Sequence, residues 1–247
     1  MSKYIWLIRH GESQGNLENR IQGWSDYPLT DLGRQQAARL AERLAYMLGL
    51  PSSQSPPPQE KPAGIGGEKA IHELVSSPLR RAAETALIIG DALALPVRYE
   101  ARLKEYNFGP LNGLTSSEIM GRFPTVRAAW QANHAWEPLP GEEGELTFIA
   151  RVRAAMDEIV TAMPEDTGLI VVAHGGSLDA CLRSWLGIAP RSPSPGLGQG
   201  SGNGHGRRAF AFDNTSLSLV RIQLHGCRVL LLNDTCHLKD IQEGKGE

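Results

Sequence analysis

Short runs of apolar residues, bounded by polar or turn-forming residues, recur along the chain and predict buried β-strands. The candidate strands are Tyr4–Ile8, Glu73–Ser76, Val97–Tyr99, Leu169–Ala173, Leu217–Gln223 and Arg228–Leu232. Between them, apolar residues return every three or four positions, which is the spacing of an amphipathic helix. The candidate helices cover about Asp31–Leu48, Leu79–Ala94, Thr115–Phe123, Thr147–Met163 and Ser177–Leu186, with Thr30 as the N-cap of the first.

The alternation of strands and helices favours an α/β fold with a doubly wound, mainly parallel sheet flanked by helices on both faces. A short turn at His225-Gly226 lies between the last two strands, which permits an antiparallel hairpin at a sheet edge. The segment Asn107–Gly144 has weaker strand signals, and we expect it to form a small helical cap over the ligand crevice.

The length of 247 residues allows one large domain or two small ones, and we expect a single domain over residues 1–247. Two segments, Pro51–Lys69 and Pro190–Arg208, are rich in Pro, Ser and Gly. Neither can bury enough apolar surface to fold alone, and each lies between predicted elements. We therefore interpret residues 51–69 and 190–208 as flexible surface insertions rather than domain linkers.

The charge balance argues against several partners. The formal net charge is −2, so nothing favours nucleic acid or an acidic membrane surface. No apolar stretch approaches a membrane span, and the five apolar residues after Lys3 are too few for a signal peptide. The three cysteines are scattered without metal-binding spacing, which fits reduced thiols in a cytoplasmic protein. We expect no bound metal and no cofactor; a homodimer is left open.

Candidate chemistry lies at the ends of two predicted strands. The first apolar run ends in Arg9-His10-Gly11, and the run Leu169–Ala173 ends in His174-Gly175-Gly176. In an open α/β sheet, residues just beyond the carboxyl ends of strands line the ligand crevice. A lone histidine there is more often a capping or packing residue. Two such histidines, one preceded by an arginine, favour a pair of imidazoles that face one crevice.

Two further segments carry charged residues at element boundaries. Ser76–Ala86 leaves a predicted strand and enters a helix with two arginines in its first turn. Arginine there opposes the helix dipole, a cost that a bound anion would offset. Arg102–Gly109 follows another predicted strand and contains Glu105. Taken alone, each segment is better explained as an ordinary solvated surface.

Together and in this order, the four segments resemble the histidine phosphatase superfamily, also called the phosphoglycerate mutase-like superfamily. Arg9-His10-Gly11-Glu12 is similar to its signature, and Ser76–Ala86 to its second arginine element. Glu105 is similar to its acidic element, and His174-Gly175 to its second histidine element. The resemblance extends from Tyr4 to about Leu238, and includes Asn214-Thr215-Ser216 and Asn233–Leu238.

The resemblance implies phosphoryl transfer to His10 as the nucleophile. Nearby arginines lower the pKa of a histidine and favour the unprotonated ring that can attack. Arg9 and Arg81 would clamp the phosphoryl oxygens, with Arg80 as the alternative to Arg81. His174 would donate to a phosphoryl oxygen, and Glu105 would protonate the leaving alkoxide and later activate water.

The same resemblance assigns four substrate-binding positions. Asn16 and the Gln22-Gly23 turn would add side-chain and backbone donors to the phosphate. Gly175 would leave room for the anion and present its N–H group. One departure is Pro140–Glu145, which lacks the serine of the Gly-Gly-Glu-Ser run that many phosphatase members carry. It leaves open whether the contacts of this segment to Glu105 match those of the family.

We interpret the chain as a phosphomonoester hydrolase that acts on a small phosphorylated metabolite through a phosphohistidine intermediate. The alternative is a cofactor-dependent phosphoglycerate mutase. Mutases of this family carry further basic residues after the acidic element, whereas this chain reads Tyr106-Asn107-Phe108-Gly109. A third possibility is an inactive member that binds a phosphorylated partner. Candidate substrates are sugar phosphates, phosphoglycerates, α-ribazole phosphate and generic monoesters, and specificity is expected to lie in the cap.

Overall fold

The computed structural model describes residues 2–50, 70–133, 139–189, 209–224, 226–239 and 241, with the side chains of 129–133 excepted. Its sheet has the strand order β3-β2-β4-β1-β5-β6. The strands are β1 (Lys3–Arg9), β2 (Ile71–Ser76), β3 (Val97–Tyr99), β4 (Gly168–Ala173), β5 (Leu217–Gln223) and β6 (Gly226–Asp234). β1 pairs in parallel with β4, and β2 in parallel with both β3 and β4. β5 runs antiparallel to β1 and to β6, so the expected terminal hairpin is confirmed.

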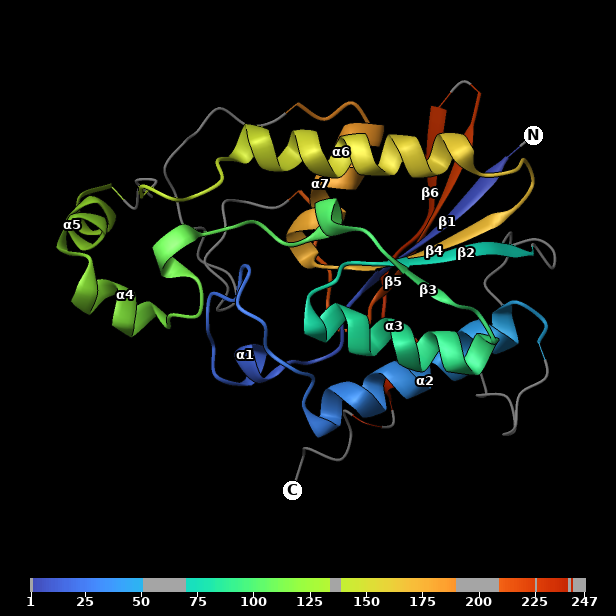
Figure 1. Ribbon diagram of the computed structural model, residues 1–247, viewed down its shortest axis with the longest axis horizontal. Helices are drawn as coiled ribbons and strands as arrows, with labels where there is room; N and C mark the ends of the chain where they lie inside the picture. Colours follow the sequence, from blue (N-terminus) through green and yellow to red (C-terminus); the bar gives the residue numbers. More distant parts are fainter. Residues whose placement is uncertain are drawn as a thin grey trace.

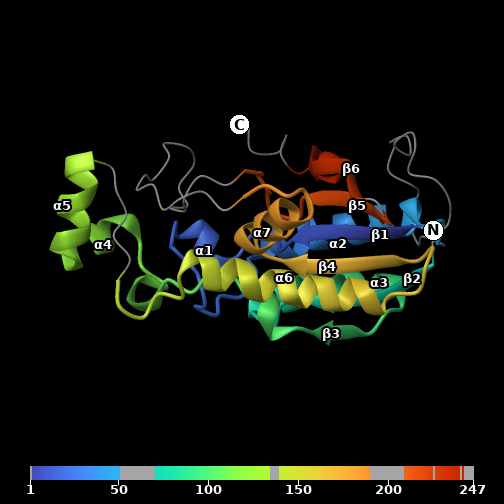
Figure 2. The ribbon, with the colours of Figure 1, turned by 90° about the horizontal axis from the view of Figure 1, so that it is seen from above.

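Helices cover both faces of this sheet. In Figure 1, α6 (Glu145–Ala162) and α7 (Gly175–Trp185) lie above the strands, and α2 (Asp31–Met47) and α3 (Arg80–Leu93) lie below them. Figure 2 shows the same elements from above. The mainly parallel, doubly wound α/β fold expected from the sequence is therefore confirmed.

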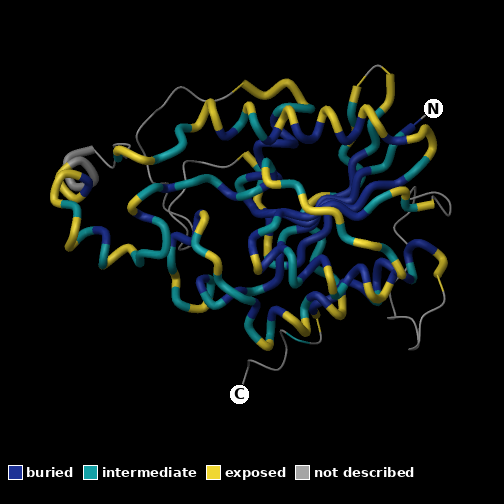
Figure 3. Tube along the Cα trace, in the orientation of Figure 1, coloured by how far each residue is buried: buried dark blue, intermediate teal, exposed yellow. Residues whose placement is uncertain are grey.

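Alternate side chains of the central strands pack into two separate hydrophobic cores, one on each face of the sheet. Ile5, Leu7 and Val171 face α6 and α7, whereas Trp6 and Ile8 face α2 and α3. Every residue of β4 is buried, which explains why its sequence is a continuous apolar run. The central strands form the dark-blue centre of the tube in Figure 3. This burial holds β1 and β4 rigidly side by side, so the residues that follow them are held in place as well.

The cap is helical, as expected. It contains the short 3₁₀ turn η2 (Gly109–Leu111), α4 (Ser116–Arg122) and α5 (Pro124–Asn133). A small apolar cluster supports it, formed by Ile21, Phe108, Leu111, Ile119 and Val126. Figure 1 shows α4 and α5 projecting beyond the edge at which β1 and β4 end.

The helix α1 (Gln14–Leu17) and the helix α5 were not predicted from the pattern, and the 3₁₀ turns η1 (Ala101–Leu103) and η3 (Cys236–Leu238) were also missed. α1 is too short to show helical periodicity. α5 begins with Pro124, directly after the residue at which the predicted helix ended.

Both expected insertions, 51–69 and 190–208, lie outside the described residues. In the described part of the chain, no helix is long and apolar enough to cross a membrane. The same residues contain no group of three or more His, Cys, Asp or Glu side chains arranged to hold a metal ion.

Candidate active site

Two histidines meet at the carboxyl edge of the sheet. Arg9, the last residue of β1, is paired with Ala173, the last residue of β4, so His10 and His174 follow in register. Their ring centroids are 5.3 Å apart, with the rings inclined at 58°. Both side chains are buried. The parallel pairing of two strands therefore creates the imidazole pair that the sequence predicted.

The ring of His10 is oriented by its own backbone neighbourhood. Its Nδ1 lies 2.7 Å from the carbonyl oxygen of Gly11. Because a carbonyl only accepts, Nδ1 carries the proton and the lone pair resides on Nε2. The carbonyl oxygen of His10 accepts hydrogen bonds from Nδ2 of Asn214 at 3.0 Å and from N of Thr215 at 3.2 Å. The residue is thus held in the tautomer that a nucleophile needs.

His174 is the N-cap residue of α7 and is completely buried. Burial, and secondarily the positive charge of Arg81, holds its pKa well below the usual value, so the ring is neutral at physiological pH. Its Nε2 lies 2.8 Å from Oγ of Ser77, a residue at the end of β2. Oγ of Ser77 also accepts from N of Leu79 at 3.3 Å, which fixes the hydroxyl against the ring of His174.

Nδ1 of His174 is buried and has no hydrogen-bond partner among the described residues. A buried polar atom without a partner is costly, which argues that this atom serves a ligand.

Arg81 is the buried arginine of the second element. Its Nη1 donates to the carbonyl of Ser25 at 2.9 Å, and its Nη2 to the carbonyl of Gly23 at 2.8 Å. Burial lowers its pKa to about 10, so it remains a cation at neutral pH. Arg80 behaves differently, because it is exposed and its Nε pairs with Glu84 at 2.6 Å. Successive residues of α3 point about 100° apart, and only Arg81 turns inward.

Arg9 connects β1 to the segment that leads into β5. Its Nη1 donates to the carbonyl oxygen of Phe212 at 2.5 Å. Its charge also contributes to the low pKa of His174. The positive charge of Arg9 therefore acts on the same buried imidazole as that of Arg81.

Glu105 lies next to the first turn of α7. Its side chain is buried, with Oε1 accepting from N of Tyr106 at 2.9 Å and Oε2 accepting from N of Gly176 at 3.0 Å. A Cβ on Gly176 would lie 2.1 Å from Oε1, so this position must be glycine for the carboxylate to fit.

The predicted phosphate loop is ordered around Ser13, the N-cap residue of α1. Oγ of Ser13 donates to Oε1 of Gln22 at 2.7 Å, and N of Ser13 donates to Oδ1 of Asn16 at 3.1 Å. Both side chains therefore present their amide oxygens to Ser13. Gly23 has φ +47°, and a Cβ there would lie 1.9 Å from Oδ1 of Asn112.

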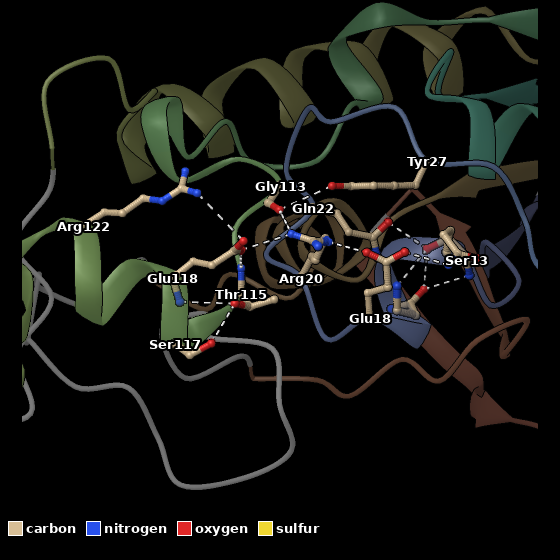
Figure 4. Close-up of polar contacts among 12 residues, drawn as sticks. Ser13, Glu18, Arg20, Gln22, Tyr27, Gly113, Thr115, Ser117, Glu118 and Arg122 are labelled. Atoms are coloured by element: carbon tan, nitrogen blue, oxygen red, sulfur yellow. Dashed lines mark hydrogen bonds and ion pairs between the residues drawn. The ribbon is translucent and has the colours of Figure 1, made fainter.

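The same loop is joined to the cap. Figure 4 shows Arg20 between them, with Nη1 donating to the carbonyl of Gly113 at 2.8 Å and pairing with Glu118 of α4 at 3.1 Å. N of Ile21 donates to the carbonyl of Leu114 at 2.9 Å. The base of the cap is therefore built onto this loop.

The segment Pro140–Glu145, whose sequence differs from the family's Gly-Gly-Glu-Ser run, still contacts the neighbours of Glu105. Oε2 of Glu142 accepts from the hydroxyl of Tyr106 at 3.2 Å, and Oε2 of Glu143 accepts from N of Asn107 at 2.9 Å. Sequence reasoning missed Ser77, Gly176 and Arg151, which touch the site from other parts of the chain. Gly176 follows His174-Gly175 directly, so the glycine pair was the one available signal.

The arrangement suits a doubly charged anion. The charges of Arg9 and Arg81 both act on His174, whose ring lies beside that of His10, and the buried N-terminus of α7 at Gly175 follows directly. These features are those of a phosphoglycerate mutase-like protein.

Comparison with known proteins agrees with this class. The sequence profile of the histidine phosphatase superfamily (branch 1) matches residues 5–49 and 66–235. The chain belongs to this superfamily. It is 35% identical over 186 residues to the glucosyl-3-phosphoglycerate phosphatase of Mycobacterium tuberculosis, which covers 72% of this chain and 73% of the relative. It is 30% identical over 193 residues to the Yersinia enterocolitica protein named "Probable phosphoglycerate mutase GpmB", which covers 76% and 77%.

Solved structures show the same fold. The native mycobacterial glucosyl-3-phosphoglycerate phosphatase superimposes with a TM-score of 0.67 at 28% identity, over 94% of this chain and 99% of that one. Bacillus stearothermophilus YhfR gives a TM-score of 0.70 at 26% identity, over 96% and 100%. The protein is an enzyme of the phosphoglycerate mutase-like type, and a phosphatase rather than a mutase.

Proposed function

We propose that this protein hydrolyses phosphomonoesters of small phosphorylated metabolites through a phosphohistidine on His10. The observation that carries the proposal is the buried pair of imidazoles 5.3 Å apart, with Nδ1 of His10 bonded to a carbonyl. This leaves Nε2 as the nucleophilic atom, and the buried cation of Arg81 acts on the neighbouring ring of His174.

In the first step, Nε2 of His10 attacks phosphorus. The bond between phosphorus and Nε2 forms as the bond to the leaving oxygen breaks, and Glu105 gives that oxygen its proton. Arg9 and Arg81 hold the non-bridging oxygens, and Nδ1–H of His174 donates to one of them as charge develops. The NH₂ groups of Asn16 and Gln22, with the N–H groups of Gly23 and Gly175, hold the same oxygens.

In the second step, water attacks the phosphohistidine. Glu105, now ionised, takes a proton from this water, the bond between phosphorus and Nε2 breaks, and phosphate leaves. Glu105 is thereby protonated again and the enzyme is restored. No residue in this cycle needs a metal ion or a cofactor.

The substrates that we propose to test first come from the relatives. Glucosyl-3-phosphoglycerate is named in the M. tuberculosis relative, and phosphoglycerate in the Y. enterocolitica relative. Release of inorganic phosphate from a panel of these compounds, sugar phosphates, α-ribazole phosphate and p-nitrophenyl phosphate, in buffer without added metal, tests the activity and ranks the substrates.

The covalent step has its own test. Brief reaction with a ³²P-labelled substrate, followed by denaturation in alkali, should leave an acid-labile label on the wild-type chain. His10→Ala should abolish both the label and turnover, whereas His72→Ala, at an exposed histidine of β2, should retain them. Substantial turnover by His10→Ala would refute the assignment.

A mutase would return the phosphoryl group to the product instead of releasing it as inorganic phosphate. Incubation with 3-phosphoglycerate and a trace of 2,3-bisphosphoglycerate should give phosphate and little 2-phosphoglycerate. Many interconversions per phosphate released would favour the mutase.

We also propose a cytoplasmic setting, which the three free thiols support. The homodimer considered from the sequence is tested by light scattering coupled to gel filtration.

A further inference from the structure

Arg151 makes an unusual set of contacts with the main chain around Glu105. It projects from the second turn of α6 and is largely buried. Its Nη1 donates to the carbonyl oxygens of Arg102 at 2.7 Å and Lys104 at 2.8 Å. Its Nη2 donates to the carbonyl oxygen of Glu105 at 2.8 Å. One guanidinium group thus holds three carbonyls of the segment that carries Glu105.

The guanidinium is itself held by a carboxylate. Glu143 pairs with Nε of Arg151 and accepts from its Nη2 at 2.9 Å. The Glu143 side chain is only 8% exposed, so this is a buried, two-point ion pair. Oε2 of Glu143 also accepts from N of Asn107 at 2.9 Å. The pair therefore holds the main chain on both sides of Glu105, from Arg102 to Asn107.

We infer that Arg151, fixed by Glu143, is a positioning residue for the proton donor Glu105; the inference rests on the proposed function. Arg151 holds Glu105 by its main-chain carbonyl oxygen. The carboxyl group is then directed by the N–H groups of Tyr106 and Gly176. Proton transfer to a leaving oxygen requires hydrogen-bond distance, so a shift of the segment by about 1 Å can cost about 100-fold in rate.

The inference also gives a role to the segment Pro140–Glu145, whose sequence differs from the family's Gly-Gly-Glu-Ser run. This stretch lacks the family's serine, yet Glu143 supplies the carboxylate that orients Arg151. The contact to Glu105 is thus maintained through the arginine of α6 rather than through a residue of the segment itself.

The test compares two kinds of leaving group. Alkyl phosphates need a proton on the departing oxygen, whereas p-nitrophenolate leaves with little help. Variants Arg151→Met, Arg151→Lys and Glu143→Gln are assayed on p-nitrophenyl phosphate and on the alkyl phosphate that the wild type hydrolyses fastest. Arg153→Met is the matched control, because Arg153 lies on the same helix, is exposed, and pairs only with Asp157 at 3.3 Å.

For Arg151→Met, kcat on the alkyl phosphate should fall about 100-fold, and kcat on p-nitrophenyl phosphate should stay within about threefold. KM should change little on either substrate, because the residues that hold the phosphate are untouched. Glu143→Gln should show the same selectivity with a smaller loss, Arg151→Lys should recover part of the alkyl activity, and Arg153→Met should match the wild type.

Equal losses on both substrates, or no loss on either, would overturn the inference. If Arg151→Met does not fold, as judged by circular dichroism, Glu143→Gln decides by the same comparison. Failure of the proposed function looks different: the wild type itself would release no phosphate, or His10→Ala would retain activity.

Discussion

At the level of single side chains, the site depends on which ring nitrogen carries the proton in each histidine. In His10 the carbonyl of Gly11 keeps the proton on Nδ1, and in His174 the hydroxyl of Ser77 occupies Nε2. The two imidazoles are therefore held by different nitrogens. His10 keeps Nε2 for the nucleophilic role that we propose, and His174 keeps Nδ1 for the proposed contact to a phosphoryl oxygen.

Gly176 sets the position of the acid in the same direct way. Gly176→Ala would place a Cβ 2.1 Å from Oε1 of Glu105 and force the carboxylate aside. We expect kcat on alkyl phosphates to fall about 100-fold, because the proton donor moves by roughly 1 Å. Gly121→Ala on α4, where nothing lies within 4 Å, is the control. Steady-state kinetics with both variants checks this, and unchanged kcat in Gly176→Ala would contradict it.

Sequence reasoning identified the residues that follow strands, but not those that approach from elsewhere. His10 and His174 were predictable because each ends an apolar run. Arg151 lies 46 positions from Glu105, in the middle of an amphipathic helix, where an arginine normally faces solvent. Its role exists only once α6 packs beside η1, and no local pattern encodes that packing.

At the level of helices and strands, a two-residue error in the predicted start of α7 hid the contact between this helix and Glu105. The pattern predicted a start at Ser177, because Gly175 and Gly176 have low helix propensity. The helix begins at Gly175 instead, which places the N–H of Gly176 on Glu105. By contrast, the strands Val97–Tyr99 and Leu217–Gln223 were predicted to the residue, since β-branched and apolar residues fill them.

The N-cap of α2 was predicted from Thr30, and its geometry is confirmed. Oγ1 of Thr30 accepts from N of Gly33 at 3.0 Å and donates to Oε1 of Glu12 at 2.8 Å. Thr30→Ala removes both bonds and should cost about 1 kcal/mol. Differential scanning calorimetry should show Tm lowered by about 2–4 °C. Thr30→Ser keeps the hydroxyl and should stay near the wild type; equal losses in the two variants would assign the effect to the methyl group instead.

For the molecule as a whole, stability should depend on pH through buried histidines. Burial lowers the pKa of His237 from 6.5 to about 4, and the pKa of His174 also lies well below 6.5. Between those values the unfolded imidazole binds a proton that the folded one does not. The free energy of unfolding therefore falls as pH falls below about 6.5, by up to about 1.4 kcal/mol per unit for each group.

His237→Gln should remove one part of this dependence. From pH 7 to pH 5 the wild type should lose about 2 kcal/mol through His237 alone, and the variant should lose that much less. Gln keeps a polar group near Oγ1 of Thr215, which lies 3.1 Å from Nε2 of His237. Urea unfolding of both proteins at the two pH values measures the difference. The same loss of stability in both proteins would show that other groups titrate.

The layout of the whole sheet also bears on the two segments that we interpret as insertions. Residues 51–69 join the end of α2 to the start of β2, and therefore connect at the sheet edge opposite to His10 and His174. Residues 190–208 join the part of the chain after α7 to the segment in which Phe212 binds Arg9, so their far end connects closer to the site.

Because both segments are poor in apolar residues, shortening either one should expose little core. Replacing Ser52–Gly67 or Ser192–Gly206 by a short Gly-Ser turn should leave kcat within a few-fold of the wild type. A collapse of activity with an unchanged circular dichroism spectrum would show that the segment takes part in closing the site. Such a collapse would be expected for residues 190–208 before residues 51–69, because the former connect closer to the site.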